Sequence, residues 1–142
     1  MNAADLNDDV NSTRQFAKDL LSDDAEGLNP AEHAAIDALP SGHALLIVRR
    51  GYEDGSRFLL DADVTSVGRH PNAGILLDDV TVSRRHAEFV RTGTTFVVKD
   101  LASLNGTYYQ GHRIDEVILE DGADVQIGKF KLTFYASKAD KK

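Results

Sequence analysis

The stretch from Gly68 to Thr107 decides the fold, and it holds three short polar fragments that each lie beside a strand-like run. The fragments are Gly68-Arg69-His70-Pro71, Ser83-Arg84-Arg85-His86 and Ser103-Leu104-Asn105-Gly106-Thr107. Glycine, proline, asparagine and serine are typical of turns, whereas branched and aromatic residues favour strands. The pattern therefore predicts chemistry that is carried on turns at the ends of strands.

The donors in these fragments suit a phosphate group better than a catalytic centre. Arg69 and Arg84 can donate forked, charge-assisted hydrogen bonds to phosphate oxygens. The hydroxyl groups of Ser83 and Ser103 can add donors, and the side-chain amide of Asn105 can hold a peptide main chain. Together these side chains predict a site for a phosphorylated peptide.

Two of these residues also have simpler interpretations. Asn105-Gly106 between strand-like runs is a strong hairpin signal, because both residues tolerate a positive φ. Alternation along a strand would send Arg84 and Arg85 to opposite faces. We expect Arg84 to contact phosphate and Arg85 to be a solvated charge.

The three fragments, in this order and at these separations, resemble the forkhead-associated (FHA) domain, whose pattern is Gly-Arg, then Ser-x-x-His, then Asn-Gly. FHA domains read phosphorylated motifs. The resemblance implies that three residues contact the phosphate, namely Arg69, Ser83 and Arg84. It implies that Ser103 assists from the next loop and that Asn105 holds the peptide main chain just after the phosphothreonine.

The same resemblance implies structural positions at Gly68, His86 and Gly106, with His86 supporting the binding loop by hydrogen bonds. A catalytic triad of Ser83, His86 and Asp100 is not supported, because the chain has no Gly-x-Ser-x-Gly nucleophile motif. We expect no enzymatic activity, no cofactor and no metal site. Adjacent carboxylates at positions 78 and 79, without a ligand-spaced series, indicate a solvated turn instead of a cation site.

Short apolar runs separated by turn residues predict an all-β fold, an antiparallel β-sandwich, from residue 43 onward. The expected strands are 44–48, 57–60, 65–68, 74–77, 87–90, 95–99, 107–109, 117–119, 124–127 and 129–135. Near the C-terminus the alternation predicts which side chains face inward. Val125, Ile127, Phe130, Leu132 and Phe134 are expected inside, and Lys129, Lys131 and Thr133 outside.

Composition bounds the remaining functions. The 142 residues suffice for one domain and a tail, and the absence of cysteine excludes disulfides and thiolate chemistry. No apolar run is long enough to span a bilayer, and the N-terminus lacks the features of a signal peptide. We therefore expect a cytoplasmic protein that binds no membrane.

The negative charge lies in the first part of the chain. Residues 1–42 hold nine acidic residues and two basic ones, a net of −7, which equals the net charge of the whole chain. The chain has no excess of basic residues, which proteins need to neutralise a nucleic-acid backbone, so we expect no nucleic-acid partner. We expect three parts: residues 1–42 as an acidic regulatory tail, mostly disordered, residues 43–137 as the phosphothreonine-binding FHA domain, and residues 138–142 as a short basic C-terminal tail.

Two short helical patterns interrupt the expected tail. Phe16, Leu20 and Leu21 fall near one face after Thr13, and Asn29-Pro30-Ala31-Glu32 reads as a helix N-terminus with proline at the first position. Both patterns are shorter than the roughly 12 to 15 residues at which isolated helices become marginally stable. We expect helices that order only against a partner or the domain.

Thr13 is the expected phosphorylation site, with Ser12 as a second candidate. Asp8 and Asp9 precede the Ser-Thr pair, and Phe16 lies three positions after Thr13, where FHA domains commonly read a second side chain. The alternative is that Thr13 only caps a helix, a role for which threonine is common. The two roles are compatible.

The whole chain resembles the small actinobacterial regulators of 2-oxoglutarate dehydrogenase and glutamate metabolism, the OdhI and GarA type. The resemblance rests on residues 77–89 and 126–130 and on the acidic tail, although Asn11-Ser12-Thr13-Arg14 replaces the usual Glu-Thr-Thr-Ser, which puts control by two kinases in doubt. It implies Ser/Thr protein kinases, metabolic enzymes and the chain's own phosphorylated tail as partners. The expected function is inhibition of 2-oxoglutarate dehydrogenase-type targets, switched off when phosphorylated Thr13 binds intramolecularly. The alternative is an adaptor that recruits phosphorylated kinases or their substrates in trans.

Overall fold

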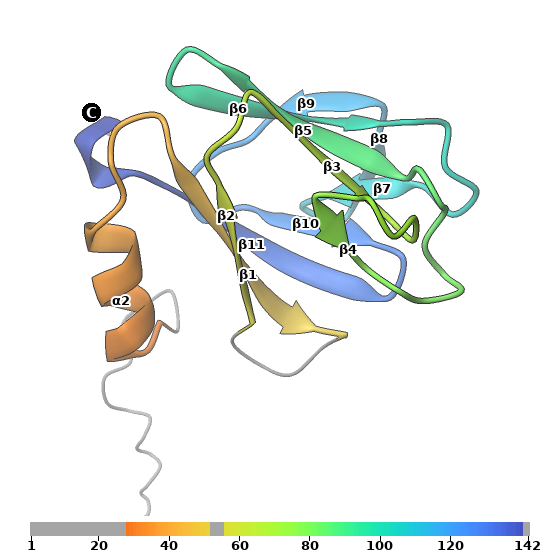
Figure 1. The fold of residues 1–142 in the computed structure, drawn as a ribbon, viewed down its shortest axis with the longest axis horizontal. Coiled ribbons are helices and arrows are strands. Elements are labelled where there is room, and N and C mark those ends of the chain that lie inside the picture. Colours follow the sequence, from red (N-terminus) through yellow and green to blue (C-terminus); the bar gives the residue numbers. More distant parts are fainter. Residues whose placement is uncertain (1–27, 52–55, 141–142) are drawn as a thin grey trace, which may run out of the picture. The chain divides into compact units, whose positions relative to one another are not determined.

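The computed structural model describes residues 28–51 and 56–140 and contains two packed β-sheets and one short α-helix (Figure 1). The expected phosphorylation site at Thr13 and the helical pattern after it lie outside the described residues. The part of the chain that is described includes no helix long and apolar enough to cross a membrane.

The first sheet has six strands in the order β2-β1-β11-β10-β7-β8. Their bounds are β2 Arg57–Leu60, β1 Ala44–Arg50, β11 Phe130–Ala136, β10 Asp124–Ile127, β7 Thr107–Tyr109 and β8 His112–Ile114. The second sheet has five strands in the order β4-β3-β5-β6-β9. Their bounds are β4 Ile75–Leu76, β3 Val64–Gly68, β5 Ala87–Thr92, β6 Thr95–Asp100 and β9 Glu116–Ile118.

The predicted all-β sandwich is confirmed, and most strands lie within two residues of their expected positions. Two features differ from the expectation. β8 was not expected, because the sequence His112-Arg113-Ile114 has only one apolar residue. This strand lies at the edge of its sheet and pairs with β7. β3 and β4 pair in parallel, with Val67 opposite Ile75, so the sandwich is not wholly antiparallel.

The core lies between the sheets and is built from the inward positions of alternating strands. Val125, Ile127, Phe130, Leu132 and Phe134 are all buried, as the alternation predicts. The expectation that Thr133 faces solvent is wrong, because its side chain is only 5% exposed. It lies on the other face of the sheet, flanked in register by Ile47 and Asp124, and its hydroxyl donates to Asp124 Oδ1 at 2.9 Å.

The segment before β1 and the segment after β11 are tied together at one end of the domain. The Ser137 hydroxyl donates to the carbonyl oxygen of Leu39, and the N–H of Gly42 donates to Asp140 Oδ2 at 2.7 Å. These two bonds join the residues just before β1 to the residues just after β11.

A helix, α2, occupies Pro30–Asp37, where the sequence shows an N-terminal cap. The N–H of Glu32 donates to Asn29 Oδ1 at 2.8 Å, and the N–H of Asn29 donates back to Glu32 Oε1 at 3.2 Å. This reciprocal pair is a capping box, which satisfies two N–H groups that a helix start would leave unpaired. The predicted cap is confirmed.

The contact between the rings of Phe96 and Phe134 joins the two sheets and generates a stability prediction. The rings lie edge to face with centroids 5.9 Å apart, Phe96 on β6 and Phe134 on β11. Phe96→Ala should lower the free energy of unfolding by about 3–5 kcal/mol, because it leaves a cavity between the sheets. Urea denaturation measures this loss.

Ile118→Ala on β9 is the control, since that side chain is 62% exposed and should change stability by less than about 0.5 kcal/mol. Equal stability of the two variants would contradict this account of the core.

Candidate functional site

The segment from Thr81 to Arg84 lies at the centre of the candidate site and is bound on one side by the turn after β3. The N–H of Arg69 donates to the carbonyl oxygen of Ser83 at 3.1 Å, and the N–H of His70 donates to that of Arg84 at 3.2 Å. A Cβ at Gly68 would collide with the carbonyl oxygen of Arg84. Glycine is therefore required where the two backbones cross.

The loop after β6 binds the same segment from the other side. The N–H of Leu104 donates to Ser83 Oγ, and Asn105 Nδ2 donates to the carbonyl oxygen of Thr81, each at 3.0 Å. The three fragments that the sequence singles out are thus brought together, with the middle fragment clamped between the other two.

His86 holds the clamp from inside. Its side chain is fully buried, Nδ1 accepts from the N–H of Ser83 at 3.0 Å, and Nε2 lies 2.8 Å from the carbonyl oxygen of Gly106. An N–H group can only donate and a carbonyl can only accept, so the ring is neutral with its proton on Nε2. His86 therefore links the segment that holds Ser83 to the loop that holds Gly106 and supports both from the interior.

Asp100, at the end of β6, organises the loop that carries Asn105. Its carboxylate accepts from the hydroxyls of Ser103 and Thr107 at 2.5 and 2.7 Å and from the N–H of Ser103 at 3.1 Å. Burial alone would raise the pKa of Asp100, but these hydrogen bonds outweigh it and hold the pKa below its ordinary value. The carboxylate stays charged and ties the loop to the strand.

This arrangement corrects the role expected for Ser103. The side chain is only 7% exposed, its hydroxyl proton goes to Asp100, and its oxygen accepts from the N–H of Gly106 at 3.0 Å. Ser103 is consequently part of the loop's internal support, because no donor remains on it for a phosphate. Gly106 has a φ of +87° and a hypothetical Cβ there would lie 2.6 Å from Arg113 Nε, so glycine is needed at that position as well.

Asp79 supports the other loop, although the sequence indicated only a solvated turn at positions 78 and 79. Both the N–H and the hydroxyl of Thr81 donate to Asp79 Oδ2, at 2.9 and 2.6 Å. These bonds, with help from Lys129 Nζ at 3.2 Å, lower the pKa of Asp79 from 3.8 to about 2. The signal for this role is the Asp-x-Thr spacing, which favours a local turn in which the aspartate accepts from the residue two positions later.

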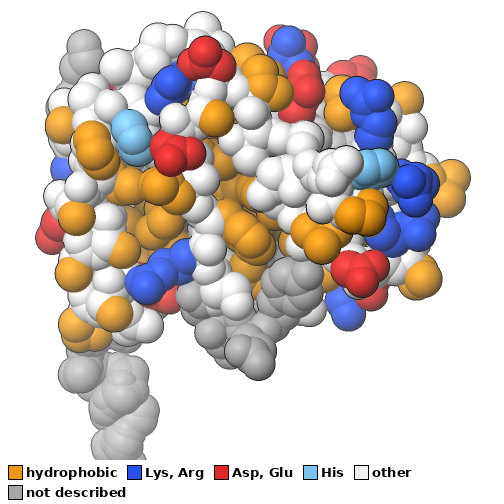
Figure 2. All heavy atoms as spheres, in the orientation of Figure 1, with side chains coloured by type: hydrophobic (Ala, Val, Ile, Leu, Met, Phe, Trp, Pro, Cys, Tyr) orange, Lys and Arg blue, Asp and Glu red, His pale blue; other side chains and the backbone are white. Residues whose placement is uncertain are grey.

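The remaining predicted site residues face solvent. Arg69, Arg84 and Asn105 are exposed, and Ser83 is half-buried. Arg69 Nε donates to the carbonyl oxygen of Val82 at 3.0 Å, which fixes the side chain and leaves both terminal nitrogens for a ligand. Because Ser83 Oγ accepts from Leu104, its own proton remains available to donate. Figure 2 shows basic side chains gathered at the end of the molecule that holds these loops.

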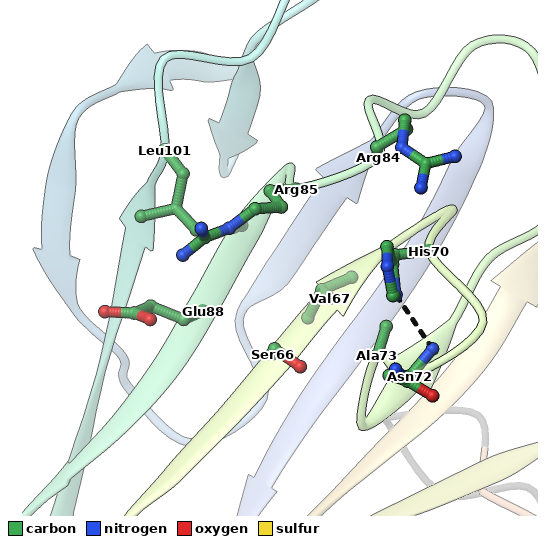
Figure 3. A pocket seen from close by; sticks show the side chains of 10 residues that line it. Ser66, Val67, His70, Asn72, Ala73, Arg84, Arg85, Glu88 and Leu101 are labelled. Atoms are coloured by element: carbon green, nitrogen blue, oxygen red, sulfur yellow. Dashed lines mark hydrogen bonds between the residues drawn. The ribbon is translucent and has the colours of Figure 1, made fainter.

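Two hollows open on either side of this segment. One, of about 570 Å³, is lined by Thr81, Asn105 and residues of β7, β10 and the turn after β10. The other, of about 330 Å³, begins at Arg84 and extends along β3 and β5 (Figure 3). The two share no lining residue: Thr81, at one end of the segment, lines the first, and Arg84, at the other end, lines the second.

The site lacks the geometry of a Ser-His-Asp triad. His86 bonds to the backbone N–H of Ser83 and not to its hydroxyl, and its other nitrogen points to Gly106. The bonds that Asp100 accepts come from Ser103 and Thr107. These side chains hold loops together and present no activated nucleophile.

Comparison with known families and sequences identifies this arrangement. The model of the FHA domain matches residues 65–128. The chain is 52% identical over 136 residues to the glycogen accumulation regulator GarA of Mycolicibacterium smegmatis, covering 92% of this chain and 86% of that protein. It is 50% identical over 126 residues to the oxoglutarate dehydrogenase inhibitor of Corynebacterium jeikeium, covering 88% of each.

Solved structures of FHA domains resemble the fold. One comes from a structural and functional study of phosphothreonine-dependent FHA domain interactions, with a TM-score of 0.61 and 28% identity over 66% of this chain and 95% of that one. Another is Mycobacterium tuberculosis EmbR in complex with a low affinity phosphopeptide, with a TM-score of 0.64 and 34% identity over 79% of this chain and 30% of that one.

The division between ligand-facing and supporting residues generates the next prediction. Arg69→Ala should lower the affinity for a phosphothreonine peptide by about ten- to hundred-fold at an unchanged melting temperature, because charge-assisted bonds worth roughly 1.5–3 kcal/mol are lost. Ser83→Ala and Asn105→Ala should also weaken binding. Calorimetric titration and thermal denaturation measure the two quantities.

His86→Ala is the matched contrast. It should lower both affinity and melting temperature, because it leaves the N–H of Ser83 and the carbonyl of Gly106 unsatisfied at about 1–3 kcal/mol each. Wild-type affinity in Arg69→Ala, or an unchanged melting temperature in His86→Ala, would contradict these assignments.

Proposed function

Because the chain belongs to the family of FHA-domain regulators that includes GarA and the oxoglutarate dehydrogenase inhibitors, we propose that it is a phosphorylation-controlled inhibitor of a 2-oxoglutarate dehydrogenase-type enzyme. Its FHA domain binds phosphothreonine. In this proposal the protein catalyses no reaction and acts in the cytoplasm. It restrains the enzyme by contact alone, and a Ser/Thr protein kinase releases the enzyme by phosphorylating Thr13.

The proposed phosphate contacts are Arg69, Ser83 and Arg84, with Asn105 on the main chain after the phosphothreonine. In an extended bound peptide, three residues span roughly 10 Å of main chain, which is the separation this proposal gives to the Cα atoms of Thr13 and Phe16. The hollow of about 570 Å³ begins at Asn105 and can take the ring of Phe16. In this proposal the tail therefore matches the site at three points: its phosphate meets the proposed phosphate contacts, its main chain meets Asn105, and Phe16 enters the hollow.

The observation that supports an enzyme-binding face is the exposure of two apolar side chains on the binding loops. Val80 is 90% exposed and Leu104 is 84% exposed. Single exposed apolar residues are ordinary, but these two belong to the loops that Ser83 and Asn105 tie together. We place the enzyme contact on Val80 and Leu104, beside the phosphate donors.

A phosphorylated tail in the site would then exclude the enzyme by covering the same loops. Thr13 precedes Leu28, where the described structure begins, by fifteen residues, and a flexible chain of that length would have a root-mean-square span on the order of 20 Å and a full extension of about 50 Å. A 100-residue domain has a radius of gyration of about 13 Å, so the tail can reach the loops. With an effective concentration near the millimolar range and a peptide affinity near 1 μM, the closed form would outnumber the open one by roughly 10³.

Phosphorylation of Thr13 should move the tail onto the domain. It adds a charge of about −1.5 to −2, which the arginines of the site can bind. We expect NMR resonances of residues 12–21 and of the loops around Ser83 and Asn105 to shift on stoichiometric phosphorylation. Inhibition of the dehydrogenase should fall in parallel.

Thr13→Ala and Arg69→Ala are the controls, and kinase treatment should leave both spectra unchanged in the loops. Loop resonances of the wild type that do not move after phosphorylation would rule out the switch. Capture of phosphorylated proteins by such a form would then favour the adaptor that acts in trans.

A further inference from the structure

The second hollow shares Arg84 with the proposed phosphate contacts, and its other lining residues have no part in the contacts proposed for phosphothreonine or Phe16. It is formed by the outward side of β3 and β5, the turn after β3 and Leu101, and it has a volume of about 330 Å³. Figure 3 shows Arg84 and Arg85 pointing apart, with the guanidinium group of Arg85 directed toward Leu101 and Glu88. Arg85 is exposed, as the sequence indicated, and it also lines this hollow.

The hollow has a positive balance of charge. Arg84, Arg85 and Glu88 line it, and neither arginine forms an ion pair or side-chain hydrogen bond with another described residue. His70 also faces it, and since its Nδ1 accepts from the N–H of Asn72 at 3.0 Å, Nε2 is the nitrogen that can carry a proton. Unpaired donors at a concave surface suit a carboxylate ligand.

The position of the hollow indicates which part of a bound peptide would reach it. Asn105 and the first hollow lie at the Thr81 end of the central segment, and this hollow begins at Arg84, at the other end. In the proposed binding mode the main chain after the phosphothreonine runs toward Asn105. The residues before the phosphothreonine would then approach from the Arg84 end and pass over this hollow.

We propose that this hollow binds acidic side chains on the N-terminal side of the phosphothreonine, and that in this chain its ligands are Asp8 and Asp9. The inference rests on the proposed function of the phosphate site. Asp9 precedes Thr13 by four residues, a span of roughly 13 Å for an extended strand. Arg85 is the specificity-determining residue, and the acidic tail supplies the complementary charge.

Glu88 provides a test because its negative charge repels the acidic side chains that we propose as ligands. It is the one carboxylate among the described residues that line the hollow, and its cross-strand neighbour is Lys99. Replacing it with glutamine should strengthen binding of an acidic peptide. A gain in affinity cannot come from damage to the fold.

The experiment uses the full chain with Thr13→Ala and two synthetic peptides of residues 6–21 phosphorylated at Thr13, measured by calorimetry. One peptide has the natural sequence, and the other carries Asp8→Asn and Asp9→Asn. We expect the natural peptide to bind about five-fold more tightly at low salt, which corresponds to about 1 kcal/mol, and the preference to vanish near 1 M salt.

Arg85→Gln should abolish the preference by weakening only the acidic peptide, and Glu88→Gln should tighten only the acidic peptide by about two- to three-fold. Arg57→Gln on β2, in the other sheet, makes the same charge change and should leave the preference intact.

Equal affinity of the two peptides, with both abolished by Arg69→Ala, would overturn this inference and leave the phosphate site standing. A preference that persists in Arg85→Gln would also overturn it, since the acids would then be read elsewhere. Failure of both peptides to bind would overturn the proposed function and this inference together.

Discussion

The buried imidazole of His86 is the interaction on which the binding surface depends. It joins two loops, through the N–H of Ser83 on one side and, 23 positions later in the chain, the carbonyl of Gly106 on the other. Both partners are backbone groups, so the ring fixes the main chain from which Ser83, Arg84 and Asn105 project. In a buried site each lost bond carries the full desolvation penalty, which makes the geometry of the two loops difficult to change.

Around this imidazole, polar groups divide into those that hold loops and those that remain for a ligand. The carboxylates of Asp79 and Asp100 each accept several short hydrogen bonds within their own loop, and both have lowered pKa values. Arg69, Arg84 and Asn105 keep donors at the surface. A site whose loops are already ordered loses little conformational entropy on binding, so more of the phosphate interaction appears as affinity.

The sequence singled out the three fragments that the structure brings together, but not which of their side chains support the loops. Gly-Arg, Ser-x-x-His and Asn-Gly have a fixed order, and the alternation of Val125 to Phe134 defines the core strands. The sequence alone could not distinguish the roles of Ser83 and Ser103. A serine hydroxyl is a free donor at the surface and a structural partner when it is buried, and the burial of Ser103 depends on its contacts with Asp100. Residue type alone likewise does not specify the hydrogen bonds of Asp79, the burial of Thr133 or the pairing of β8. These features depend on local turns or on neighbouring strands.

The most direct test of this account is the tautomer of His86, read from the ¹⁵N chemical shifts of its ring in the full chain near neutral pH. The account predicts a neutral ring with an unprotonated Nδ1 and a protonated Nε2, and a proton on Nε2 that exchanges slowly because the side chain is buried. An imidazolium, or a ring with its proton on Nδ1, could not accept from Ser83 and would contradict the link between the two loops.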